Sequence, residues 1–210
     1  MSELFSIQLQ NRQQQGRDGI WLDLPTTTEQ VQAALRQIGI SSDNPQGLFI
    51  SGYFAEEEKR FAIPYNMVLA SNVDELNFLA SRLETLSTGE RAELNAALQA
   101  PQSELFSIGR ITDFPENVDY YVHLPEVHGP AQLGDYYLNR SGMVDMPEEW
   151  KGGIDTAQFG RYVAHQEQGV FTQYGYLVKS GDEWQKVHEG QPVPEEYRVL
   201  SFPSPEILRD

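Results

Sequence analysis

The fold class is decided by the stretch IWLDLPTTTEQVQAALRQIG, which spans residues 20–39. Its first five residues are apolar enough for a strand, and Pro25 ends that strand. Thr26 and Glu29 have the spacing of a capping box, and the apolar residues that follow recur every three or four positions up to Gly39. The stretch therefore predicts a strand followed directly by an amphipathic helix.

Further strands are predicted on both sides of this stretch. Residues 5–10 alternate apolar and polar side chains, as a half-buried strand does, and they are the expected partner of residues 20–24. Residues 48–54 are apolar and aromatic and predict a third strand, with weaker strands at 61–63 and 67–69. Residues 1–70 are therefore expected to form a small α+β unit.

The middle of the chain carries two more helix starts. Asn72 with Glu75, and Ser87 with Glu90, have the spacing of capping boxes, and each pair precedes leucines and alanines at helical intervals. Two antiparallel helices joined by a short turn follow from this spacing. They define a helical unit at residues 71–104.

The last part, residues 105–210, mixes both kinds of element and is expected to be an acidic α+β unit. Residues 105–112 have a strand-like pattern, and a short strand is expected at 120–124. Pro130 suits the first turn of one helix, and Asp155 caps another. Residues 170–179 and 184–188 are interpreted as the two strands of a closing hairpin.

The composition is that of an acidic folding chain. Its 210 residues include 31 acids against 15 bases, for a formal net charge of −16. This charge repels nucleic-acid phosphates and anionic membranes, so no direct binding to nucleic acid or membrane is expected. The absence of Cys excludes disulfides and thiolate metal sites. Because the chain also shows neither a signal peptide nor a long apolar stretch, we expect a cytoplasmic protein.

The motifs of common enzyme classes are missing from the sequence. The chain has no phosphate-binding Gly-rich loop and no nucleophile elbow around a serine. Its histidines do not have the spacing of a zinc site, and we expect them on the surface. We therefore predict no catalytic residue, no metal ligand and no cofactor. The four histidines are His123, His128, His165 and His188.

The negative charge is concentrated between residues 111 and 160, where the sequence has nine acids and only two bases, Arg140 and Lys151. These acids are interleaved with aromatic and aliphatic residues, unlike the bunched charges of a disordered tail. The pattern predicts an ordered acidic surface, which could occupy a DNA-binding groove. The alternative is that the charge only keeps the protein soluble. The nine are Asp113, Glu116, Asp119, Glu126, Asp135, Asp145, Glu148, Glu149 and Asp155.

Several segments along nearly the whole chain together resemble one family, the ArdA-type antirestriction proteins. Residues 133–137, with Gly142 and residues 146–149, resemble the segment known in that family as the antirestriction motif. The other similar segments are GIWLDLP (19–25), VDELNFLA (73–80), DTAQFGRY (155–162), FTQYGYL (171–177) and PEEYR (194–198).

The resemblance implies an α+β fold built as an elongated array of small α/β and helical units with short mixed or antiparallel sheets. It also implies a homodimer that mimics bent B-form DNA and occupies the DNA-binding site of type I restriction-modification enzymes. The nine acids would then replace phosphates, with Glu56, Glu57 and Glu58 as further candidates. Two alternatives remain open: a hydrolase that uses a pair of carboxylates, and an acidic adaptor for an unrelated protein partner.

Overall fold

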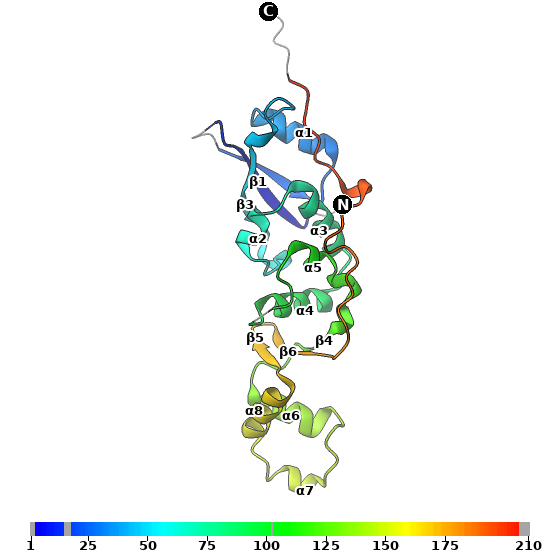
Figure 1. Ribbon diagram of the computed structural model, residues 1–210. Helices are drawn as coiled ribbons and strands as arrows, with labels where there is room; N and C mark the ends of the chain where they lie inside the picture. The colour runs from blue at the N-terminus through cyan, green and yellow to red at the C-terminus, as the bar shows by residue number, and fades with distance from the viewer. Residues whose placement is uncertain (1–2, 15–17, 102, 206–210) are drawn as a thin grey trace, which may run out of the picture. The chain divides into compact units, whose positions relative to one another are not determined.

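A computed structural model shows the arrangement of the elements (Figure 1) and describes residues 3–14, 18–101 and 103–205. The chain divides into two compact units, each assembled from separate segments. The first unit contains residues 1–86, 106–115 and 186–210, and the second contains residues 87–105 and 116–185. The predicted boundaries at residues 70 and 104 remain a prediction.

The first unit contains an antiparallel sheet in the order β2-β1-β3. Its strands are β1 (Phe5–Asn11), β2 (Ile20–Leu24) and β3 (Leu48–Phe54), so the three predicted strands are confirmed. Ile7 and Leu9 of β1 and Leu24 of β2 are fully buried. One face of the sheet therefore contributes to the core.

Helix α1 (Thr28–Gln37) follows β2 as predicted, and it buries Val31, Ala34 and Leu35. The capping box is one residue later than expected: the Thr27 side chain accepts from the Gln30 backbone, and Gln30 reaches back to the Thr27 backbone. Three consecutive threonines offer nearly equivalent caps, which explains the shift of one position.

Two predicted strands of the first unit are helices. Residues 67–69 lie in α2 (Tyr65–Leu69), and residues 108–112 form α5 (Ile108–Thr112). The buried side chains Leu105, Ile108 and Ile111 recur every three positions, which is helical spacing and not the alternation of a strand. Residues 61–63 also lie outside the strands, although Phe61 and Ile63 are buried.

The two helices predicted between residues 71 and 104 are confirmed as α3 (Val73–Leu83) and α4 (Thr88–Gln99). Each starts with the predicted capping box, formed by Asn72 with Glu75 and by Ser87 with Glu90. Helix α3 belongs to the first unit and α4 to the second.

The second unit contains an antiparallel sheet in the order β4-β6-β5. Its strands are β4 (Tyr121–Leu124), β5 (Val170–Thr172) and β6 (Gly175–Lys179). The predicted hairpin is wrong in its second strand, because both strands lie within residues 170–179 and residues 184–188 form none. Gly175, with φ of +117°, allows the tight turn between β5 and β6.

Helices α6 (Pro130–Asp135) and α8 (Thr156–Glu167) of the second unit pack around Val127, Leu133, Ala164 and Tyr176, with the π-helical turn η5 (Tyr136–Arg140) also contacting this core. Helix α7 (Glu148–Lys151) buries no residue. The helices and the two small antiparallel sheets confirm the predicted α+β class. Among the described residues, no helix is both long and apolar enough to cross a lipid bilayer.

Candidate partner-binding surface

Most of the acids predicted to form a surface are exposed in the second unit. The structure leaves six of the nine exposed, while Glu116 and Asp135 are half-buried and Asp113 is buried. Glu56 and Glu57 of the first unit are also exposed, and the Glu58 side chain lies outside the described residues. The six exposed acids are Asp119, Glu126, Asp145, Glu148, Glu149 and Asp155.

Two glycines hold helices α6 and α8 unusually close together. A Cβ on Gly134 of α6 would collide with the backbone oxygen of Thr156, and one on Gly160 of α8 with that of Pro130. Both glycines are therefore required by the close approach of α6 and α8, and not by an unusual φ angle. This contact fixes the segment that carries Asp135 to the helix that begins at Asp155.

The only two bases between residues 111 and 160 are both used in local ion pairs. Arg140 lies 3.0 Å from Asp135, and Lys151 lies 2.7 Å from Glu148. Five of the six exposed acids have no ion pair within the described part of the chain, so their charges stay unneutralised. These are Asp119, Glu126, Asp145, Glu149 and Asp155.

Asp155 has a second role besides its surface position. Its Oδ1 accepts a hydrogen bond of 2.9 Å from the Gln158 backbone N–H and so caps α8, as the sequence predicted. A change at Asp155 would therefore affect the start of the helix as well as the surface charge.

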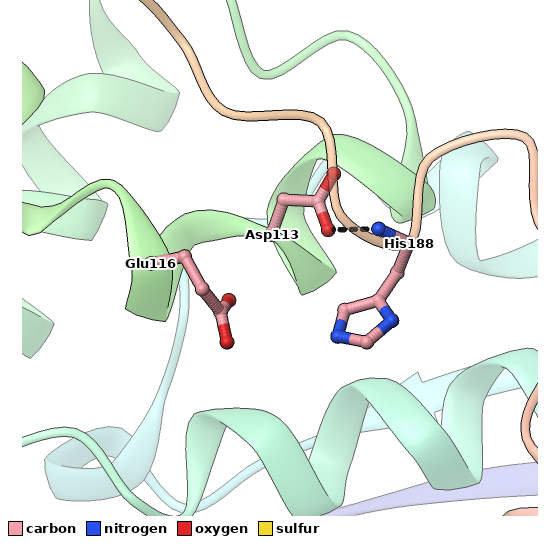
Figure 2. Close-up of side chains that lie close together, drawn as sticks. All are labelled: Asp113, Glu116 and His188. Atoms are coloured by element: carbon pink, nitrogen blue, oxygen red, sulfur yellow. Dashed lines mark hydrogen bonds between the residues drawn. The ribbon is translucent and has the colours of Figure 1, made fainter.

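Asp113 stabilises the first unit from a buried position, unlike the other predicted acids. Its Oδ1 accepts from the His188 backbone N–H at 2.6 Å, and its Oδ2 accepts from Val187 and Glu189 at 3.2 and 3.1 Å. Figure 2 shows the carboxylate facing the His188 backbone; Glu116, also labelled there, belongs to the second unit. We therefore leave Asp113 out of the acidic surface proposed below.

His128 and His165 are exposed as predicted, whereas His123 and His188 are half-buried. The His188 ring packs edge-on against Phe78 in the first unit, with ring centroids 4.9 Å apart. His123 lies in β4 with its Nε2 2.7 Å from the Tyr174 carbonyl oxygen. Burial lowers the pKa of His123, and the hydrogen bond to Tyr174 opposes that shift. Both rings are therefore engaged in packing or hydrogen bonding within their own unit.

Glu93 is an acid of the second unit that the sequence analysis did not single out. It lies in α4, and its Oε1 is buried with no hydrogen-bond partner in the part of the chain that the structure describes. Burial raises the pKa of Glu93 to about 8, and the charges of Glu90 and Asp119 add to that shift. The sequence did contain one signal for this site: Glu90 and Glu93 lie about one helical turn apart, so their like charges are neighbours on the helix.

Glu167, at the end of α8, also serves the fold. Its two oxygens accept hydrogen bonds from the hydroxyls of Tyr137 at 2.8 Å and Tyr176 at 2.5 Å. Desolvation, together with the hydrogen bond to this carboxylate, raises the pKa of both tyrosines. Glu167 thus joins α8 to η5 and β6.

The carboxylate-pair alternative can be compared with a cavity of the first unit, about 850 Å³ in volume. Asp74 and Glu75 both line it. Asp74 Oδ1 accepts from the backbone N–H groups of Val199 and Leu200, each at 2.7 Å, and Glu75 Oε2 accepts from Asn72 at 3.2 Å. These two carboxylates hold the backbone in place. Glu189, a third acid lining the cavity, pairs with Arg110 and Lys186, so this cavity gives no specific support to a hydrolase.

Comparison with known proteins found one matching family. The family model described as Antirestriction protein (ArdA) matches residues 15–178. The matched range includes the nine predicted acids, Glu93, Glu167 and both close-contact glycines. No curated protein matches the chain.

Proposed function

The chain belongs to the ArdA family of antirestriction proteins, and from this premise we propose that it inhibits type I restriction-modification enzymes by mimicking DNA. Membership of the family implies an antirestriction function and an interaction with restriction-modification enzymes. The proposal adds a mechanism, in which the chain acts as an inhibitor that competes with DNA for the enzyme's binding groove.

The observation that carries this proposal is the set of exposed, unneutralised carboxylates on the second unit. Asp119, Glu126, Asp145 and Glu149 are exposed and have no ion pair among the described residues. DNA presents about one negative charge per 1.7 Å of its axis, and enzymes bind it through lysine and arginine side chains. Carboxylates held on a folded frame can be attracted to the same basic groove.

The second unit holds its helices together without using the charges of these exposed acids. Gly134 and Gly160 set the contact of α6 with α8, and Glu167 joins α8 to its neighbours through two tyrosine hydroxyls. A mimic needs such a frame, because mobile acids would lose entropy when they dock. We expect each exposed ion pair with the enzyme to contribute about 1 kcal/mol or less, so that affinity comes from many carboxylates together.

We also propose that the chain acts as a homodimer, which is the assembly that the family resemblance implies. Three large side chains of the second unit support this proposal because they are exposed: Met143, Trp150 and Tyr162. Exposed apolar side chains mark an interaction site when they lie together in one patch. Light scattering coupled to gel filtration should give a mass close to twice 23.8 kDa, and a monomeric mass would reject the dimer.

The mimicry can be tested with variants that remove charge and keep side-chain shape. The four changes Asp119→Asn, Glu126→Gln, Asp145→Asn and Glu149→Gln should each weaken inhibition of a purified type I enzyme slightly. The quadruple variant should weaken it strongly, with the circular dichroism spectrum unchanged. If one single change abolishes inhibition, a localised site replaces the distributed surface.

A matched control removes the same amount of charge from the first unit. Its changes should leave inhibition nearly intact if the acids of the second unit replace phosphates, whereas equal losses in both quadruple variants would mean that only the total charge matters. The four control changes, all at exposed acids, are Asp18→Asn, Asp43→Asn, Glu195→Gln and Glu196→Gln.

A further inference from the structure

The outer face of the sheet in the first unit exposes two large aromatic rings. Trp21 of β2 is 48% exposed and Phe54 of β3 is 57% exposed. The rings meet edge to face with centroids 6.3 Å apart. They lie on the opposite side of the sheet from the buried Leu22 and Leu24, because side chains alternate along a strand. Two neighbouring rings are therefore open to solvent.

The sheet is shaped to seat the larger of these rings. Gln8 of β1 lies opposite Trp21 on one side and Gly52 of β3 on the other. A Cβ on Gly52 would lie 3.0 Å from the Trp21 ring and 3.0 Å from Gln8 Cβ, which is tighter than ordinary contact. Glycine at position 52 therefore lets the indole lie across the middle strand.

Carboxylates border the aromatic pair. Asp23 is exposed and lies two residues after Trp21, on the same face of β2. Ser6 donates a hydrogen bond of 2.6 Å to Asp23 Oδ1, which orients the carboxylate. Glu56 and Glu57, both exposed, follow Phe54 closely in the chain. Asp23 thus places a negative charge on the same face as the rings, whereas Glu56 pairs with Lys59 at 3.3 Å.

A third aromatic ring on the same face already carries a guanidinium group. Phe49 of β3 lies opposite Gln10, on the outer side, and the Arg12 guanidinium carbon lies 5.1 Å from the centre of its ring. This distance is within the range of a cation–π interaction. The sheet therefore provides, within the chain itself, an example of the contact that Trp21 and Phe54 offer to an outside partner.

We propose that this aromatic face, defined by Trp21 and Phe54 with Asp23, binds arginine side chains of the restriction-modification enzyme. Charge complementarity selects this occupant: rings attract a guanidinium through their faces, and Asp23 pairs with its positive charge. The inference rests on the proposed function, since it takes the same enzyme as partner. Besides the acids of the second unit, the enzyme would then contact this aromatic face, where binding depends on stacking against the rings as well as on charge.

The arginine preference can be tested without the enzyme. The acetyl-triarginine amide peptide is titrated into the ¹⁵N-labelled protein, and the indole N–H signal of Trp21 is followed by NMR after assignment with Trp21→Phe. The signal should shift and saturate, and it should still shift when Asp119, Glu126, Asp145 and Glu149 are neutralised. The citrulline peptide has the same shape without the charge and should leave the signal unmoved. Equal shifts with both peptides, or no shift, would overturn the inference.

The partner is tested by affinity for a type I enzyme. Trp21→Ala and Phe54→Ala should each weaken binding about two- to five-fold, the range for one exposed cation–π contact. Phe106→Ala, at another exposed ring of the first unit, is the control and should have no such effect. Circular dichroism shows whether each variant is folded, and Trp21→Phe, which keeps a ring at this position, should retain most of the affinity.

The possible outcomes separate this inference from the proposed function. Normal enzyme binding by a folded Trp21→Ala, Phe54→Ala double variant would overturn the inference and leave DNA mimicry intact. A wild-type chain that does not bind the enzyme would overturn the proposed function, whatever the peptide titration shows. Conversion of a dimer to a monomer by the double variant would show that a second copy covers this face, which would also overturn the inference.

Discussion

Replacing Glu93 with glutamine should stabilise the protein at neutral pH. In the folded state the pKa of Glu93 is raised to about 8 from the ordinary 4.5, first by burial and then by Glu90 and Asp119. Its Oε1 is buried with no hydrogen-bond partner among the described residues. Glutamine has the same shape and never ionises, so Glu93→Gln removes the cost of holding either a buried charge or a proton at neutral pH.

The magnitude follows from the difference between the folded and unfolded pKa of Glu93. Unfolding releases the proton between pH 4.5 and about 8, so the wild-type free energy of unfolding falls as pH rises through this range. At pH 7, which is 2.5 units above the unfolded pKa of 4.5, the shift corresponds to about 3 kcal/mol at 1.36 kcal/mol per pKa unit. Because Glu93 is partly exposed and its charge is screened, we expect about 1 to 2 kcal/mol.

Urea unfolding of wild type and Glu93→Gln should be compared at pH 4, 7 and 8.5, with Glu149→Gln as the control at an exposed position. The advantage of Glu93→Gln should be near zero at pH 4, where both side chains are neutral, and should reach its full value above pH 8. Glu149→Gln should change stability little at any of these pH values. An advantage that does not depend on pH, or none at all, would refute the reasoning.

Three other substitutions test how the frame is held together. Gly160→Ala should destabilise the chain by about 2 kcal/mol or more, because its Cβ would meet the Pro130 backbone. Gly152→Ala is the control and should leave stability unchanged, because the space around Gly152 is open. Equal melting temperatures for the two variants would contradict the close contact. Asp113→Asn should cost about 1 to 3 kcal/mol in urea unfolding, since it leaves buried backbone N–H groups without a charged acceptor; a stability equal to wild type would show that those bonds contribute nothing. Tyr176→Phe should cost about 1 kcal/mol by removing one of the two donors to Glu167, and calorimetry showing no change would contradict this.

The sequence predicted the elements whose signals are local. The alternation in residues 5–10 and the capping boxes at Asn72 and Ser87 each lie within a few residues, and the structure forms these elements as expected. Residues 105–112 were misread because their apolar residues fit a strand at first sight, whereas the buried ones recur at helical spacing. Short segments give too few residues to separate the two periods.

The sequence could not separate acids that serve the fold from acids that face the solvent. Asp113 is buried because it accepts bonds from residues 187–189, more than 70 positions later in the chain. Glu93 is likewise partly buried, and Glu167 is hydrogen-bonded, through tertiary packing that composition does not encode. The sequence shows that the surface is acidic. Which acids lie on that surface depends on which ones the tertiary structure buries.

The central claim is that the chain and DNA compete for one basic groove of a type I restriction-modification enzyme. The most direct measurement is displacement of a fluorescent DNA duplex from the purified enzyme by this protein, repeated at several DNA concentrations and between about 0.05 and 0.2 M salt. The account predicts that excess DNA overcomes the inhibition and that the affinity of the protein for the enzyme falls as salt rises. A complex that holds the enzyme, the DNA and this protein together, or an affinity that salt leaves unchanged, would contradict it.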